Sequence, residues 1–405
     1  MEKKTAIIVG VAIAVVIVIA GIGAYYATLK PPAPPAVPTV EITYTGCGLM
    51  PMLLATGEID GYMAWQPFIA VAQESEIGKL VSYSQDLPPA GKWKDHPCCC
   101  IFVRDDLVER NPQLIADFCA LITVADEYVC EHPDEAAEVA ADWLVGGGPI
   151  KYGEITVSSV EMEKKSIPTI KFVTEPSDDW VKGNDLFLDV QRDLEYITER
   201  LKATGIEESH ALLFNFTPYY EAKEMLERGE IITPPVEERT IGIGYQPTDH
   251  HTQLWIACDK WEYFKDNYGM YLKEIKHKEE YEFVVNNESV ARITLTRTTA
   301  GPDMMTLVSQ DTLQIGLVGV PPAIITVDKG TPGKMIHPIH TEGSGLVVVK
   351  DAPCESGNWT SFIEWVNKRS EEGKAVKIAA PLRGSIQDVQ LKYALKESGI
   401  ETVEV

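Results

Sequence analysis

The chain has 405 residues, of which 45% are hydrophobic, so it can bury a large core, and its length predicts two lobes or domains. Its 60 acidic and 36 basic residues give a formal net charge of -24. This charge repels phosphate backbones, and we therefore expect no nucleic-acid partner.

The N-terminal segment contains an uncharged apolar stretch, Thr5–Leu29. A helix over this range is about 37 Å long at about 1.5 Å per residue, which is enough to span a bilayer with some tilt. Two lysines precede it and place the N-terminus inside. We therefore expect a cell-membrane protein with a single-pass anchor over residues 1–29 and an extracytoplasmic body. A cleaved signal peptide is the alternative, but the stretch is long and no clear cleavage site follows it.

Residues 30–38 are rich in proline. Such a segment forms a semi-rigid polyproline spacer of about 3.1 Å per residue. We expect this linker to hold the folded body off the membrane.

Three consecutive cysteines, Cys98, Cys99 and Cys100, begin an apolar run that ends at Val103. In such a run cysteine behaves as a small hydrophobic residue, and the pattern predicts a buried strand. The cysteine spacing matches neither a disulfide framework nor a standard zinc motif. We therefore expect no cofactor and no metal, with these three cysteines as the alternative metal ligands.

Helical periodicity follows the cysteine run in three segments, 104–131, 133–145 and 185–203. The dipeptide Asn111-Pro112 predicts a break inside the first of them. We expect these helices to cover one lobe.

Two strand-to-helix units stand out in the second half of the chain. A strand over 240–245 leads through a polar loop into a helix at about 250–260. A second short strand ends at Gly384, and Ser385 with Asp388 forms a capping box for a helix that should end at Gly399.

The order of these segments predicts a circular permutation. The sequence typical of the start of a two-lobed binding protein, 240–251, lies in the middle of the chain. Residues 403–405 have the composition of a buried strand and residues 40–42 repeat that pattern, so the two segments either compete for one position or pair side by side. We expect the two ends of the folded body to meet in one sheet, in a monomer or, alternatively, in a domain-swapped dimer.

Separated motifs resemble those of the taurine, nitrate and sulfonate group of ABC-transporter solute-binding proteins, the NMT1-like family. They are Gly244-Tyr-Gln-Pro-Thr-Asp-His-His251, Gly316-Leu-Val-Gly-Val-Pro-Pro322, His340-Thr-Glu-Gly-Ser-Gly-Leu-Val-Val348 with Gly384-Ser-Ile-Gln-Asp388, and Ala64-Trp-Gln-Pro-Phe68 with His96-Pro-Cys-Cys99. The resemblance implies a two-lobed α/β fold of the type II periplasmic-binding-protein kind. The permuted order and the expected N-terminal transmembrane helix depart from the family's pattern. Each lobe should be a sheet flanked by helices.

The resemblance also implies two hinge strands, 98–104 and 345–350. The remaining parts are 105–227 and 240–344 for lobe 1, 228–239 for the permutation linker between them, and 39–97 and 351–405 for lobe 2. The permutation seam then falls inside lobe 2.

The cleft between the lobes should be lined by strand-end loops and helix N-termini, which suit a small anion. The residues that we expect to contact the solute are Trp65, Gln66, His96, Gln246, Thr248, His250, His251, Gly319, Val320, Pro321, His340, Glu342, Ser385, Ile386 and Gln387. For Ser385 the alternative is that the side chain only caps its helix and does not contact the solute.

These features predict a binding protein and not an enzyme. The expected function is to capture a small, anionic solute such as a sulfonate, taurine or nitrate and to deliver it to an ABC permease driven by a cytoplasmic ATPase. A thiamine precursor or another heterocycle is the alternative solute, and a sensor ectodomain is an alternative role.

A pyrimidine synthase of the same superfamily is an enzyme alternative, since it carries a similar cysteine run. Val318 and Pro322 stand where that synthase has its Schiff-base lysine and its donor histidine. Neither side chain can form the imine or supply the imidazole, so the sequence argues against this activity.

Overall fold

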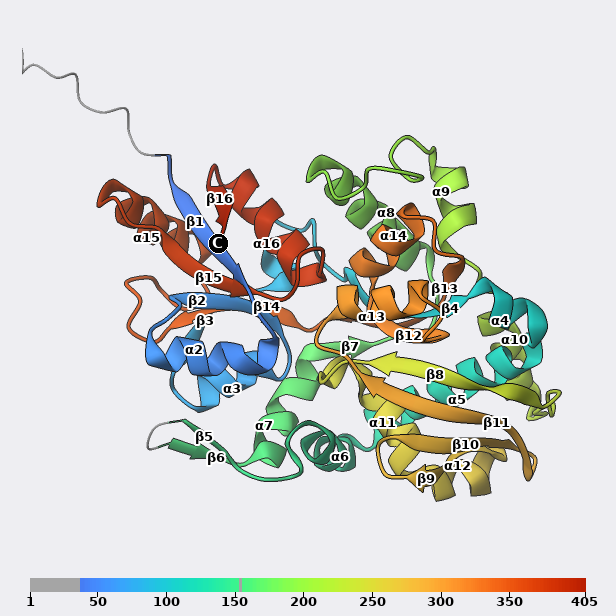
Figure 1. Cartoon of the computed structure of the whole chain (residues 1–405). Coiled ribbons are helices and arrows are strands. Elements are labelled where there is room, and N and C mark those ends of the chain that lie inside the picture. The colour runs from blue at the N-terminus through green and yellow to red at the C-terminus, as the bar shows by residue number, and fades with distance from the viewer. Residues whose placement is uncertain (1–36, 153–154) are drawn as a thin grey trace, which may run out of the picture.

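The computed structural model describes residues 37–152 and 155–405. The predicted anchor lies outside these residues, as does all but the end of the proline-rich linker. Within the described ranges, no helix combines the length and the apolar character needed to cross a membrane. The described chain has a mixed α/β fold with two main sheets flanked by helices, an arrangement consistent with a two-lobed binding protein (Figure 1).

One sheet has six strands, and this sheet with its helices is called lobe 2 below. Their order is β16-β1-β15-β2-β14-β3, with bounds β1 (Thr39–Tyr44), β2 (Gly61–Trp65), β3 (Gly78–Tyr83), β14 (Ser344–Val349), β15 (Val376–Ala380) and β16 (Glu401–Glu404). The first and last strands of the described chain, β1 and β16, are parallel neighbours (Figure 1). The segments expected at the seam therefore pair side by side, whereas the circular permutation itself stays a prediction.

The other main sheet has eight strands, and this sheet with its helices is called lobe 1 below. Their order is β7-β13-β4-β12-β8-β11-β10-β9, with bounds β4 (Pro97–Arg104), β7 (Ile170–Phe172), β8 (Glu237–Tyr245), β9 (Met270–Lys276), β10 (Glu280–Val285), β11 (Glu288–Arg297), β12 (Ile315–Gly319) and β13 (Gly333–Glu342). The cysteine run forms β4, and all its residues except Arg104 are buried, as the sequence predicts. A small hairpin of β5 (Ile150–Tyr152) and β6 (Ile155–Val157) forms a third sheet.

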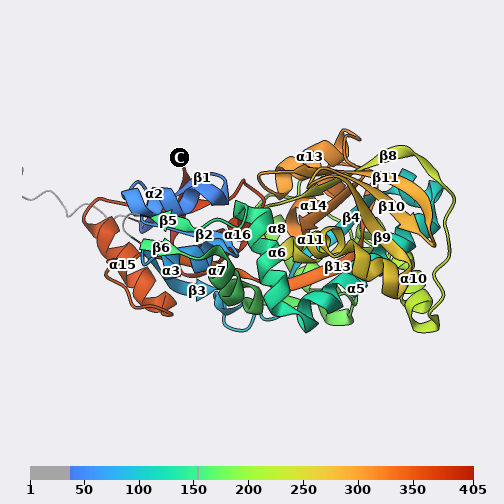
Figure 2. The ribbon, with the colours of Figure 1, turned by 90° about the horizontal axis from the view of Figure 1, so that it is seen from below.

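Helices cover both main sheets. Lobe 2 carries α2 (Met50–Thr56), α3 (Phe68–Glu74), α15 (Trp359–Glu371) and α16 (Ile386–Glu397). The other helices are α4 (Asp105–Arg110), α5 (Pro112–Glu131), α6 (Pro133–Val145), α7 (Ser159–Ser166), α8 (Asp178–Asp193), α9 (Ile206–Leu213), α10 (Thr217–Arg228), α11 (Thr252–Asp259), α12 (Trp261–Tyr268), α13 (Gly301–Ser309) and α14 (Val320–Asp328). Two perpendicular views show the sheets side by side, with α7 packed between α3 and α6 (Figures 1 and 2).

The segments expected to be hinge strands lie inside the sheets. Residues 98–104 belong to β4 of the eight-stranded sheet, and residues 345–349 belong to β14 of the six-stranded sheet. The chain passes between the two sheets beside them, over residues 84–96 and at Gly343, where β13 ends and β14 begins. Gly343 has a φ of 85°, a backbone conformation that favours glycine.

Several predicted helices have the expected bounds. The break at Asn111-Pro112 separates α4 from α5, the segment 133–145 is α6, and Ser385 caps α16 by accepting a hydrogen bond from the Asp388 N–H. The prediction of a helix over 185–203 is wrong at both ends, because Ser177 caps α8 earlier and the helix stops at Asp193.

A buried carboxylate explains why α8 stops. The side chain of Asp328 accepts hydrogen bonds from the backbone N–H groups of Thr198, Glu199 and Leu201, at 2.9, 3.1 and 2.7 Å. These bonds hold the chain after α8 as an irregular loop instead of a further helical turn.

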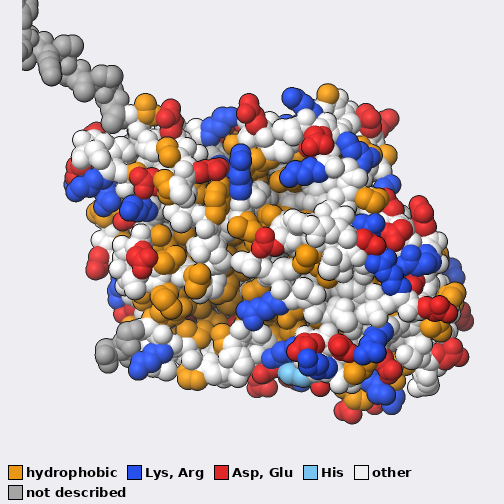
Figure 3. Space-filling view, in the orientation of Figure 1, with side chains coloured by type: hydrophobic (Ala, Val, Ile, Leu, Met, Phe, Trp, Pro, Cys, Tyr) orange, Lys and Arg blue, Asp and Glu red, His pale blue; other side chains and the backbone are white. Residues whose placement is uncertain are grey.

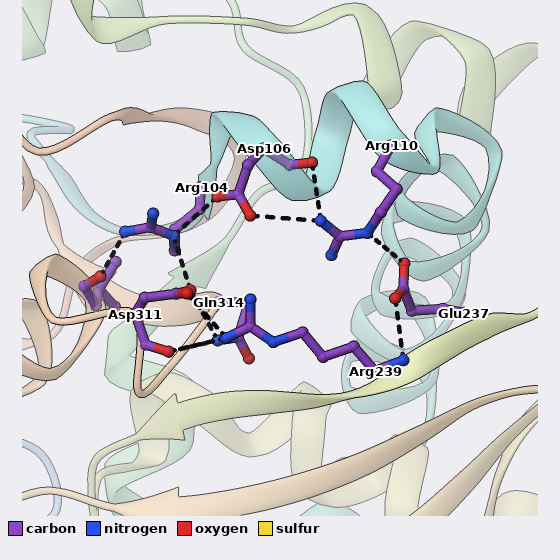
Figure 4. Close-up of polar contacts among 8 residues, drawn as sticks. Arg104, Asp106, Arg110, Glu237, Arg239, Asp311 and Gln314 are labelled. Atoms are coloured by element: carbon purple, nitrogen blue, oxygen red, sulfur yellow. Dashed lines mark hydrogen bonds and ion pairs between the residues drawn. The ribbon is translucent and has the colours of Figure 1, made fainter.

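Charged side chains join the outer ends of several lobe 1 elements (Figure 4). Arg104 at the end of β4 contacts Asp106 at 2.9 Å and Asp311 at 3.1 Å, and Arg239 in β8 contacts Asp311 at 3.0 Å. Arg110 in α4 reaches Glu237 at the start of β8, at 2.9 Å. Because most of these groups are partly exposed, each pair contributes about 0–1 kcal/mol. The cluster therefore holds these ends close together but adds little to the free energy of unfolding.

The strand β13 carries a fully buried histidine on the side that faces α5 and α10. The ring of His337 lies 3.0 Å from the Thr123 hydroxyl oxygen and packs edge-on against Tyr219. Burial lowers the pKa of His337 to about 4, although the Pro338 carbonyl acts in the opposite direction. The folded state therefore binds this proton less readily than the unfolded state, whose histidine pKa is about 6.5.

We expect the stability of the protein to depend on pH through His337. Between about pH 6.5 and pH 4 only the unfolded state binds the proton, so the free energy of unfolding falls with pH by up to about 3 kcal/mol from this group. His337→Gln should flatten the dependence in chemical denaturation between pH 7 and pH 4. The matched control is His277→Gln, whose ring is exposed, and an equal slope in both variants would contradict this assignment.

Candidate functional site

A small cavity lies where the two main sheets meet. Its volume is about 20 Å³, which is room for roughly one water molecule. Lobe 2 contributes Trp65, Ser385, Ile386 and Gln387, and lobe 1 contributes Cys98, Cys99, Gln246, Thr248, His250, Gly301, Gly319 and Pro322. Side chains of both sheets therefore line a space that is small enough for an ion or a very small solute.

The N-terminus of α16 forms the lobe 2 wall of this cavity. Gly384, at a φ of 84°, turns the chain from β15 into the helix, and Ser385 caps it. The first N–H groups of an α-helix have no partner within the helix and carry a partial positive charge. The Gln387 amide donates a hydrogen bond to the Ser344 hydroxyl at 2.8 Å, which fixes its orientation. This wall therefore presents a fixed set of donors.

Gly319, at the start of α14, lets the opposite wall approach α16. A Cβ atom at this position would lie 3.0 Å from the Ile386 Cδ1 atom. Glycine thus allows the two lobes to come into direct contact at the cavity.

The indole of Trp65 closes one side of the cavity. Its Nε1 atom is buried and has no hydrogen-bond partner among the described residues. A buried donor without a partner costs about 1–3 kcal/mol, so the Trp65 N–H is an unsatisfied donor in a residue that lines the cavity. Trp65 also lines an outer groove of about 450 Å³ that includes Arg297 of β11. Figure 3 shows hydrophobic side chains gathered over α2 and along the boundary between the sheets.

The loop after β8 joins the two lobes beside the cavity. The Thr248 hydroxyl donates to the Gln66 carbonyl at 2.9 Å, and the Asp249 N–H donates to the same carbonyl at 3.3 Å. The Gln66 N–H in turn donates to the Gly343 carbonyl at 3.0 Å. The predicted site loop is therefore tied to the end of β2 and to the crossover between the sheets.

Two cysteines and two histidines gather at the lobe 1 wall. The Sγ atoms of Cys98 and Cys99 and one ring nitrogen each of His250 and His340 all lie within 4.8 Å of one another, and all four residues are buried. The strands explain this gathering, because His340 of β13 pairs with Cys99 of β4. The third cysteine does not take part, since the Cys100 thiol donates to the Val318 carbonyl at 3.5 Å.

The surroundings shift the pKa values of the two thiols in opposite directions. Burial raises the pKa of the Cys99 thiol, but the hydrogen bond with Cys98 and the neighbouring His340 and His250 lower it, so that it lies well below its usual range. Burial and then Cys99 raise the pKa of the Cys98 thiol. Burial also lowers the pKa of His340 to about 4, with His250 acting in the same direction. Of the two thiols, Cys99 is therefore the more acidic.

The structure places the other expected site residues away from the cavity wall. The Gln66 side chain contacts Thr169, the His96 ring lies 2.9 Å from the Ser84 hydroxyl oxygen, and Glu342 accepts from the Asp95 N–H at 3.0 Å. Val320 and Pro321 lie in the first turn of α14, and His251 accepts from the Gln246 N–H at 3.0 Å. The expected residues that do line the cavity are Trp65, Gln246, Thr248, His250, Gly319, Ser385, Ile386 and Gln387.

Sequence reasoning did not place four of the lining residues in the site. Cys98 and Cys99 were expected as strand residues, or alternatively as metal ligands with Cys100, and Gly301 and Pro322 carried no site signal. The histidines were a usable signal, because His250 and His340 both lie in motifs that were expected near the cleft.

The comparisons with known proteins agree with this architecture. The model of the NMT1-like family matches residues 31–145 and 234–405, which is more than half of the chain. The chain belongs to the NMT1-like family. The unmatched segment between the two matches includes the β5–β6 hairpin and the helices α7 to α10.

One relative gives no further functional information. An uncharacterized protein of Methanocaldococcus jannaschii is 43% identical over 107 residues, which cover 26% of this chain and 74% of the relative. No solved structure matches the chain. Family membership therefore supports a solute-binding protein and leaves its solute open.

Gly343→Ala tests the contact between the crossover and the histidine loop. An added Cβ atom would lie 2.5 Å from the His250 Nε2 atom, so His250 must move. Gly357→Ala is the matched control, because Gly357 also has a positive φ, of 70°, but nothing lies within 4 Å of an added Cβ atom. We expect Gly343→Ala to reduce the free energy of unfolding by about 1–3 kcal/mol more than the control in chemical denaturation. Equal losses would contradict this account of the crossover.

Proposed function

We propose that the protein captures a small anionic solute between its two lobes and delivers it to an ABC permease driven by a cytoplasmic ATPase. The observation that carries this proposal is the cavity whose walls come from both sheets, with Trp65 and the start of α16 on one side and the loop after β8 on the other. A solute held there contacts both lobes at once. The predicted N-terminal anchor, with the body outside the membrane, suits such a receptor.

The chemistry of the walls favours a small anion or a solute with one anionic group. No lysine or arginine lines the described cavity, so the positive field comes from the N-terminus of α16, supported by the Trp65 N–H. Arg297 in the outer groove is a fixed positive charge close to the cavity. On a protein with a net charge of -24, this local field provides attraction that the overall charge does not.

Two contacts that bridge the sheets support the proposal of lobe closure. The Tyr196 hydroxyl, after α8, donates to Asp388 of α16 at 2.7 Å, and Lys396 of α16 contacts Asp193 at 2.7 Å. A bound solute adds contacts that exist only in the closed arrangement and therefore shifts the population toward it. The closed form is then the form that docks on the permease.

The solute class is open to a direct test on the full chain. Thermal unfolding is measured with taurine, short alkanesulfonates, nitrate, bicarbonate and pyrimidine heterocycles. A solute that binds only the folded state adds about 2.7 kcal/mol of stability at a hundredfold excess over its Kd. The small cavity leads us to expect the largest shift with a small anion. A shift with a heterocycle alone would favour the alternative solute class, since Trp65 offers a stacking surface. No shift with any of these solutes would contradict the proposal.

Ser385→Ala separates solute binding from helix capping. Loss of the cap alone costs about 0.5–2 kcal/mol of stability, and Ser177→Ala removes a comparable cap from α8, where Ser177 accepts from the Trp180 N–H at 3.2 Å. We expect only Ser385→Ala to raise the solute Kd, by about three- to tenfold, in isothermal titration calorimetry. An unchanged Kd would mean that Ser385 is a cap and not a contact.

A further inference from the structure

Cys98, Cys99 and His250 line the cavity, with His340 behind them, and the proposed capture of a solute does not use their combined chemistry. We infer that these four residues form a binding site for one transition-metal ion, of which zinc fits the donor set best. Two thiolates and two imidazoles are a common tetrahedral donor set for zinc in proteins. This inference is independent of the solute.

The distances between the donor atoms approach those of a tetrahedral site. The Cys98 Sγ atom lies 3.6 Å from the His250 Nδ1 atom. Zinc–sulfur and zinc–nitrogen bonds of about 2.3 and 2.05 Å at a tetrahedral angle also place these atoms about 3.6 Å apart. The Cys99 Sγ atom lies 4.0 Å from the same nitrogen, and no two donor atoms are more than 4.8 Å apart. An ion therefore needs only a contraction of the cluster by about 1 Å.

Each imidazole has a lone pair available for an ion. The His250 Nε2–H donates to the Gly343 carbonyl at 2.8 Å, so its Nδ1 lone pair faces the thiols. In His340, the Nδ1 atom lies 3.4 Å from the Thr341 carbonyl oxygen, and the buried Nε2 atom has no hydrogen-bond partner among the described residues. Metal-bound histidines commonly donate their second N–H to such a carbonyl, which fixes the ring orientation.

The strand pairing explains how adjacent cysteines reach the same point. Consecutive side chains of a regular strand point to opposite faces. Here the pairing of β4 with β13 shifts register on both sides of the His340–Cys99 pair, and Cys98 has no partner in β13. Such bulges re-aim side chains and are common next to functional sites. The irregularity turns two neighbouring thiols toward the histidines, whereas Cys100 lies outside the cluster.

A site that holds an ion also leaves no unbalanced charge in the protein interior. Two thiolates balance the charge of a divalent ion, so the ion adds no net charge to the interior. The same ion occupies the His340 lone pair, which otherwise costs free energy without a partner. With four protein donors the site is of the closed, structural type, and it joins β4, β13 and the loop after β8. It would therefore hold the lobe 1 wall of the cavity in place.

The test measures bound metal in the full chain without any solute. The protein is purified under reducing conditions, stripped with a chelator and reloaded with zinc, and the metal content is measured by mass spectrometry. We expect one ion per chain. Reloading with cobalt(II) should give the absorption of tetrahedral cobalt with thiolate-to-metal charge transfer. A reduced protein that binds no zinc and gives no such cobalt spectrum would overturn the inference.

Single substitutions assign the donors. Cys98→Ser and Cys99→Ser should lose the bound ion and the thiolate charge-transfer band, whereas the matched control Cys100→Ser should keep both. Equal metal content in all three variants, or equal loss in all three, would overturn the assignment. If a variant does not fold, the cobalt spectrum of the unaltered protein still decides. Because metal is measured without solute, failure of this inference is distinguishable from failure of solute capture.

Discussion

The backbone carbonyl of Gly343 accepts two hydrogen bonds on which the site depends. One comes from the Gln66 N–H of lobe 2, at 3.0 Å, and the other from the His250 Nε2–H of lobe 1, at 2.8 Å. Gly343 is also the residue at which the chain passes from β13 to β14, and therefore from one sheet to the other. One peptide unit thus joins the lobes, orients the histidine loop and directs the remaining His250 nitrogen toward Cys98 and Cys99.

This arrangement couples the shape of the cavity to the relative position of the lobes. The Gln66 carbonyl accepts from Thr248, so the loop that carries His250 is bonded to lobe 2 directly as well as through Gly343. Movement of one sheet relative to the other must break or bend these bonds. In the proposed function, a solute at the cavity wall would contact the side chains that make these bonds, which would link binding to closure.

Local sequence signals predicted the parts of the fold that depend on neighbouring residues. The capping box at Ser385, the break at Asn111-Pro112 and the buried strand at Cys98 are of this kind, since each depends on residues within a few positions. The end of α8 was not predictable in this way, because Asp328, far along the chain, holds the loop that follows the helix.

The candidate site was predictable only in part for the same reason. Helix N-termini and strand-end loops identified Ser385, Thr248 and His250 as residues near one cleft. The cysteine–histidine cluster joins residues that are 152 positions apart, such as Cys98 and His250, and it requires a register shift between β4 and β13. No spacing rule contains that information, so the sequence favoured a purely structural role for the cysteines.

The central claim is that one solute contacts both lobes, and hydrogen–deuterium exchange of the full chain tests it most directly. Exchange is measured with and without the solute that gives the largest thermal shift. The account predicts that two segments gain protection together, 246–251 after β8 and 385–389 at the start of α16. Protection of one segment alone, or of neither, would contradict capture between the lobes.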